Sequence, residues 1–168
     1  MKKLAFSLVL LAGVAAMSDT VALACGSKFL VSIRSPRYQR LLANLKPTSI
    51  LVYWKQDAAT PDEDRWHPKA EKALEMVGHT VQVTFDQEQF RDAADSGNYE
   101  VVIMLLGEAR ALKSEVESMY PTAALLPIAH FPTRSEYSQA KKEFGTVFRT
   151  PSTASKFLTA IEKARSSR

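Results

Sequence analysis

The stretch NYEVVIMLLGEAR, residues 98–110, decides the fold. Residues 100–106 are almost all apolar, and the run ends at Gly107, just before a stretch with helical spacing. Near-continuous apolar runs of this length are typical of parallel strands that are buried on both faces. The stretch therefore predicts a central strand that needs helices on both sides, which is the arrangement of an α/β domain.

Short apolar runs and helical patterns alternate on both sides of this strand. Further strands are expected at residues 49–54, 80–85, 124–131 and 146–149. Helices are expected at residues 68–77, 86–97, 109–119 and 135–144, and from residue 152 onward. Five strand–helix units of this kind imply parallel crossovers and a three-layer α/β sandwich. A five-stranded parallel sheet with the flavodoxin-like order 2-1-3-4-5 is the usual solution at this size.

Three local details accompany this prediction. Asp86 is placed to cap the helix that follows it, and Ser152 is placed to cap the last helix, because short polar side chains accept hydrogen bonds from the first turn. Pro127 is expected near the start of its strand, since proline cannot donate to a sheet ladder.

Residues 1–24 have the features of a secretory signal peptide. Lys2 and Lys3 form a basic head, and an apolar stretch follows. Ala22 and Ala24 are small residues at the two positions that signal peptidase reads. We therefore expect the mature chain to be exported, in a periplasmic or membrane-anchored form. A short anchor that stays attached is the alternative, although the apolar run is shorter than a typical membrane span.

Cys25 is the only cysteine of the chain and directly follows the expected cleavage site. It cannot form an intrachain disulfide, and no Cys-His motif for zinc or haem exists. Three interpretations stay open: a lipidated cysteine, an ordinary soluble exported protein, and a free thiol that pairs between chains. Ala24 and Gly26 fit a lipoprotein site, whereas Leu23 stands where a small residue is usual.

Residues 25–47 form a basic segment without acidic residues. Tyr38, Leu41 and Leu45 recur at the spacing of one helix face, and Pro47 ends the pattern. The segment therefore predicts an N-terminal amphipathic helix ahead of a domain that spans residues 48–168. Its apolar face either packs on that domain or binds a partner, which would be an envelope protein or an anionic membrane surface.

The domain resembles the receiver domain of bacterial response regulators. YEVVIMLL, residues 99–106, resembles the third strand of receivers, which is often Y-D-V-V-L-L-D. FRTPSTASKFLTAIEKA, residues 148–164, resembles their fifth strand and last helix, in which a Lys-Pro pair precedes a run like F-L-x-A-I. The resemblance implies the flavodoxin-like fold.

The resemblance also shows where the chemistry of receivers would lie. They use an acidic pair after the first strand, an aspartate at the tip of the third, a Thr or Ser after the fourth and a lysine after the fifth. The matching positions here hold Tyr53-Trp54-Lys55, Leu105, Thr133 (shifted) and Thr150. Leucine has no nucleophilic oxygen, and the aromatic pair offers no carboxylates to a hard cation. The resemblance therefore implies a degenerate receiver without receiver-type phosphorylation.

A ligand pocket is expected at the carboxyl ends of the strands, where open α/β sheets bind ligands. The candidate residues are Trp54, Lys55, Asp57, Asp86, Gly107, Glu108, His130, Arg134, Arg149 and Thr150. Of these, Lys55, Arg134 and Arg149 could hold an anion, or they are solvated loop charges.

No metal site is expected from His67, His79 and His130, because His79 and His130 fall at opposite edges of the sheet. The sequence has no dinucleotide fingerprint, and no cofactor is expected. The net charge of +4 is too small to argue for a nucleic-acid partner.

Two classes of function remain. The first is an exported, non-catalytic receiver-like module that binds a protein partner or the envelope. The second is a periplasmic protein that binds a small molecule or anion in the strand-end pocket. Convergence of Lys55 and Arg149 on one pocket would favour the second class. An exposed apolar stripe at Tyr38, Leu41 and Leu45 would favour the first.

Overall fold

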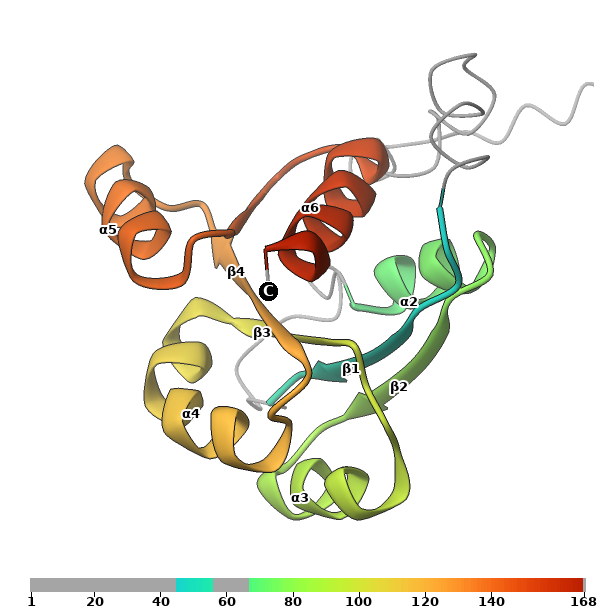
Figure 1. Ribbon diagram of the computed structural model, residues 1–168. Coiled ribbons are helices and arrows are strands. Elements are labelled where there is room, and N and C mark those ends of the chain that lie inside the picture. The colour runs from blue at the N-terminus through green and yellow to red at the C-terminus, as the bar shows by residue number, and fades with distance from the viewer. Residues whose placement is uncertain (1–44, 56–66, 168) are drawn as a thin grey trace, which may run out of the picture.

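Five parallel strands form the centre of the molecule (Figure 1), a computed structural model that describes residues 45–55 and 67–167. The strands are β1 (Ser49–Tyr53), β2 (Thr80–Thr84), β3 (Val101–Leu105), β4 (Ala124–His130) and β5 (Phe148–Thr150). Their order, β2-β1-β3-β4-β5, confirms the predicted topology. The predicted signal peptide, Cys25, Tyr38, Leu41, Asp57 and the side chain of His67 lie outside the described residues.

Helices cover both faces of the sheet and make the expected three layers. They are α2 (His67–Glu75), α3 (Gln87–Ser96), α4 (Leu106–Met119), α5 (Arg134–Phe144) and α6 (Ala154–Ser166). Buried side chains of α2 and α6 pack on one face, here called the front face, and those of α3 and α4 pack on the back face. Helix α5 packs against the far end of the back face, where Ala140 contacts Ala129 and Val147.

Strand β3 is buried on both faces, as its sequence predicts. Val101 and Ile103 belong to the front core, whereas Val102 and Met104 belong to the back core. None of these four side chains is more than 1% exposed. Burial of each such side chain contributes about 1.5–3 kcal/mol, so this short strand ties the two helical layers together.

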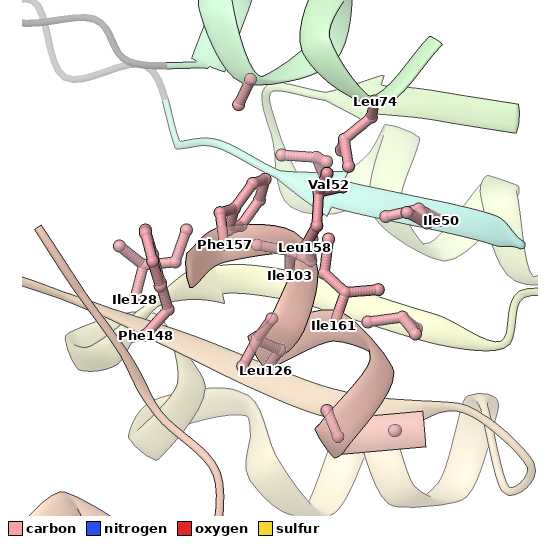
Figure 2. Packing of buried hydrophobic residues seen from close by; sticks show 14 of the residues in the cluster. Ile50, Val52, Leu74, Ile103, Leu126, Ile128, Phe148, Phe157, Leu158 and Ile161 are labelled. Carbon is pink, nitrogen blue, oxygen red and sulfur yellow. The ribbon is translucent and has the colours of Figure 1, made fainter. Parts of the chain in front are cut away.

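The front core joins strands that are distant in sequence (Figure 2). Side chains from β1, β3 and β4 meet Leu74 of α2 and the apolar face of α6. Phe157 of α6 contacts Phe148 of β5, with ring centroids 4.8 Å apart. Leu45, the one described residue of the predicted N-terminal apolar face, packs against this core. The rest of the predicted N-terminal helix lies outside the described residues.

The back core is rich in aromatic rings. Phe90 of α3 lies between Tyr53 and Tyr120, at centroid distances of 5.0 and 5.3 Å. The Tyr120 hydroxyl donates a hydrogen bond to the carbonyl of Phe90. Burial raises the pKa of Tyr120 to about 12, with smaller contributions from Tyr99 and Asp95. The hydroxyl therefore stays protonated, and its hydrogen bond joins α3 to the end of α4.

The predicted caps are half right. The Asp86 side chain accepts a hydrogen bond from the Gln89 amide at 2.8 Å and caps α3, as expected. The cap of α6 is Thr153 rather than Ser152, and its side chain accepts from the Lys156 amide. Both residue types cap helices well, so the sequence pattern alone does not choose between neighbours.

Pro127 is the fourth of seven residues in β4, so its expected place near the start of the strand is wrong. The Ala124 amide donates to the Glu100 carbonyl, on the β3 side. By alternation along the strand, the nitrogen of Pro127 faces the β5 side. Strand β5 begins to pair only at Ile128, so proline removes no hydrogen bond from the ladder at this position.

His79, just before β2, is a buried histidine whose two ring nitrogens have no hydrogen-bond partner among the described residues. It faces charges from α6, namely Glu162 and Arg165, and Glu100 before β3. Arg165 pairs with Glu162 at 3.0 Å and with Glu100 at 3.5 Å. Burial lowers the pKa of His79 below its ordinary 6.5, an effect that Glu162 opposes in part.

This burial predicts a pH-dependent stability. Above pH 6.5 His79 is neutral in both states, whereas below it the unfolded chain binds a proton that the folded chain resists. Stability should therefore be complete above this value and decline as the pH falls below it. We expect His79→Leu to raise the free energy of unfolding by about 1 kcal/mol at neutral pH and to flatten the decline. Urea unfolding of both proteins across this pH range measures the effect, and parallel pH profiles would contradict it.

Candidate functional site

The carboxyl edge of the sheet begins with Trp54 and Lys55, directly after β1. Trp54 is buried, and its amide donates to the carbonyl of Thr84 at 2.8 Å. Lys55 is exposed, and its Nζ lies 3.8 Å from Oε1 of Glu108 in the first turn of α4. A pair this exposed contributes little to stability, yet it provides a counter-ion for Lys55.

The ends of β2 and β3 offer no cluster of carboxylates in the described part of the chain. Asp86 is engaged as the cap of α3. Leu105, the last residue of β3, is half-buried and packs against the front core. No group of three or more His, Cys, Asp or Glu residues that could hold a metal ion occurs within residues 45–55 and 67–167. The last residue of β3 therefore adds an apolar side chain to this edge.

His130 at the end of β4 contacts Thr150 at the end of β5. Both residues were expected at the ligand site. The His130 Nδ1 lies 2.7 Å from the Thr150 hydroxyl. The next residue, Phe131, is 69% exposed, has a φ of 44°, and stands edge-on to the His130 ring. A positive φ is uncommon for an aromatic residue. It turns the Phe131 ring out toward solvent beside the imidazole.

Helix α5 begins beside this pair with a complete capping box. The Thr133 side chain accepts from the Glu136 amide, and the Glu136 carboxylate accepts from the amide and hydroxyl of Thr133. These hydrogen bonds lower the pKa of Glu136. Thr133, which the resemblance matched to the receiver Thr or Ser, therefore serves as a helix cap. Arg134 follows it as an exposed first residue of α5.

The expected anion site does not assemble from Lys55 and Arg149. Strands β1 and β5 are separated by β3 and β4. Neighbouring strands lie about 4.8 Å apart, so the two residues start roughly 14 Å from one another. Arg149 instead lies over the Tyr137 ring of α5, at 5.7 Å from its centroid. Gly107 lies in the first turn of α4, and Asp57 is outside the described residues.

A groove alongside β5 was not expected from the sequence. It has a volume of about 390 Å³ and lies between α5 and α6. Tyr137 and Lys141 line it from α5, Phe148 and Arg149 from β5, and Lys156 and Lys163 from α6. Arg149 is its one residue among the expected site residues. Lys156 and Lys163, which lie two helical turns apart and so share one face of α6, were the sequence signal that could have pointed to it.

No protein-family profile matches the chain, and no curated protein is significantly similar to it in sequence. Solved structures are similar in fold. The signal receiver domain of an HD domain-containing protein from Pseudomonas fluorescens Pf-5 has a TM-score of 0.56 and 16% identity, over 73% of this chain and 100% of that one. NtrX from Brucella abortus in complex with ADP has a TM-score of 0.60 and 17% identity, over 73% of this chain and 27% of that one.

A third similar structure carries the phosphorylated state. It is a response regulator protein from Burkholderia pseudomallei with a phosphorylated aspartic acid, a calcium ion and citrate. Its TM-score is 0.54 and its identity 17%, over 71% of this chain and 69% of that one. The chain therefore has the fold of a response-regulator receiver domain. No helix within the described residues is long and apolar enough to cross a membrane.

Proposed function

We propose that this protein is an exported, non-catalytic receiver-like module that binds a protein partner and is not phosphorylated. The observation that carries the proposal is Leu105, an apolar residue at the end of β3 that packs into the core. A phosphoacceptor needs an oxygen nucleophile, and leucine has none. The scaffold is retained, whereas the group that would accept a phosphoryl group is absent.

The surroundings of Leu105 support the same proposal. A hard divalent cation takes several oxygen ligands. Asp86 is held by its cap hydrogen bond, and Glu108 is paired with Lys55. The lysine that receivers carry before their proline is Thr150 here, and its hydroxyl contacts His130. Asp86, Glu108 and Thr150 therefore each have a structural partner, whereas Arg134 is exposed.

A binding role is supported by what the surface leaves exposed. Phe131 projects its ring beside His130, and the groove along β5 carries cations from three elements. Large exposed aromatic rings and concave charged surfaces are common features of protein interfaces. Without a phosphorylation step, such surfaces would be available to a partner at all times.

The alternative, a protein that binds a small molecule or anion at the strand ends, has less support. That function needs Lys55 and Arg149 to bind the same ligand. Lys55 follows β1 and Arg149 lies in β5, and strands β3 and β4 lie between them. Two other expected residues, His130 and Thr150, contact one another. Their contact does not add a positive charge that could hold an anion.

The first prediction concerns phosphorylation. We expect the purified protein to show no labelling by acetyl phosphate and no magnesium-dependent binding of beryllofluoride, because Leu105 provides no acceptor. Intact-mass spectrometry and fluorine NMR measure the two reactions, with a phosphorylatable receiver domain as the positive control. Stoichiometric incorporation of either group would overturn the proposal.

The second prediction concerns export and Cys25. In a diderm host, we expect the full-length gene to yield an envelope protein that lacks residues 1–24 and starts at Cys25. Mass spectrometry of the N-terminus and cell fractionation measure this. A chain that keeps Met1 and stays in the cytoplasm would contradict export.

Cys25→Ser then separates the two exported forms. If Cys25 is acylated, the wild type will pellet with membranes and the variant will be soluble in the periplasm, because lipid chains add about 0.8 kcal/mol per buried methylene. If both proteins are soluble, the exported form is unanchored.

A further inference from the structure

All the charged residues that line the groove between α5 and α6 are basic. Lys141 comes from α5, Arg149 from β5, and Lys156 and Lys163 from α6. None of the residues that line the groove is acidic. Four cations around a volume of about 390 Å³ create a positive potential that a concave, low-dielectric wall strengthens.

Four basic side chains outside the groove have glutamate counter-ions in the described part of the chain. Lys55, Arg91, Arg110 and Arg165 each lie within ion-pair distance of a glutamate. In the described part of the chain, the four groove cations have no such partner. The Nζ of Lys141 and the guanidinium of Arg149 both approach the Tyr137 ring, at 5.8 and 5.7 Å. The aromatic face attracts each of these two cations. The two positive charges also repel one another, and a bound anion would reduce this repulsion.

The groove has the dimensions of an extended chain. Lys156 and Lys163 are seven residues apart on α6, which corresponds to about 10 Å along the helix axis. An extended peptide advances about 3.3 Å per residue and places every second side chain on the same face, so carboxylates two or four residues apart, roughly 7 or 13 Å, lie within reach of these two long lysine side chains. The floor includes the largely buried ring of Phe148. A flat membrane surface would not reach this floor between two helices.

The groove also follows an open strand edge. Strand β5 is the last of the sheet and pairs with β4. The Phe131 amide donates to the Thr150 carbonyl, so the main chain of Thr150 faces β4. By alternation, the main-chain groups of Arg149 face the groove. Open edges of this kind accept an additional extended segment through main-chain hydrogen bonds.

We propose that an extended acidic segment of a partner protein binds in this groove along β5. Its carboxylates would contact Lys141, Arg149, Lys156 and Lys163, and its main chain would meet the edge at Arg149. The inference rests on the proposed function, because it assigns the surface and the partner chemistry of the binding module.

The test measures binding of a fluorescein-labelled peptide with glutamate at every second position and valine or serine between. The control peptide has glutamine in place of each glutamate. We expect saturable binding of the glutamate peptide to the mature protein by fluorescence anisotropy, weaker at high salt, and no binding of the glutamine peptide. Lys156→Glu combined with Lys163→Glu should weaken binding by at least about tenfold.

Lys142→Glu is the matched control, because Lys142 is an exposed lysine of α5 that does not line the groove. It should change the affinity by less than about twofold, since only screened, long-range charge is altered. Lys156 and Lys163 are exposed, so the double variant should keep the melting temperature of the wild type, which shows that lost binding is not lost folding.

Four results would overturn the inference. The first is that the glutamate peptide binds no better than the glutamine peptide, and the second is that it binds the double variant as well as the wild type. Vesicles of phosphatidylglycerol and phosphatidylcholine binding through the same lysines would identify a membrane surface instead. Self-association that the double variant abolishes would identify a second copy. If the peptide test fails and acetyl phosphate still gives no label, the inference of an acidic segment is wrong. The proposed function as a binding module without phosphorylation would then still stand.

Discussion

The burial of β3 between two helical layers is the constraint on which the rest of the structure depends. Val101 to Met104 alternate between the front core and the back core, and none is appreciably exposed. Strand β3 also pairs with β1 and β4, so it connects the first half of the sheet to the second. Removal of apolar surface from water on both faces of one strand therefore fixes the layers, the strand order and the edge at which all five strands end.

The same apolar character continues into the place where a receiver performs its chemistry. Leu105 extends the front core to the carboxyl edge, and the nearby carboxylates of Asp86 and Glu108 serve a helix cap and an ion pair. Unpaired charge is found elsewhere, along β5. The basic groove along β5 therefore lies at a different place in the fold from the end of β3.

The sequence predicts those features that depend on local pattern. The double burial of β3, the strand order and the Asp86 cap follow from apolar runs, crossover lengths and one polar side chain. The groove was missed because Lys141, Arg149 and Lys156 belong to three elements that only the tertiary fold brings together. Lys55 and Arg149 were grouped wrongly for a related reason: all strand ends look equivalent in a sequence, whereas the sheet order sets β1 and β5 far apart.

The central claim is that this receiver-like scaffold is complete without a divalent cation at its strand ends. Thermal unfolding of the mature protein in millimolar magnesium chloride, compared with EDTA at matched ionic strength, tests it most directly. A cation that binds the folded state raises its melting temperature, and the rise continues with the logarithm of the cation concentration above the Kd. The account predicts the same melting temperature in both solutions. A rise with magnesium that follows this dependence would show that the folded protein holds a metal ion and would contradict the account.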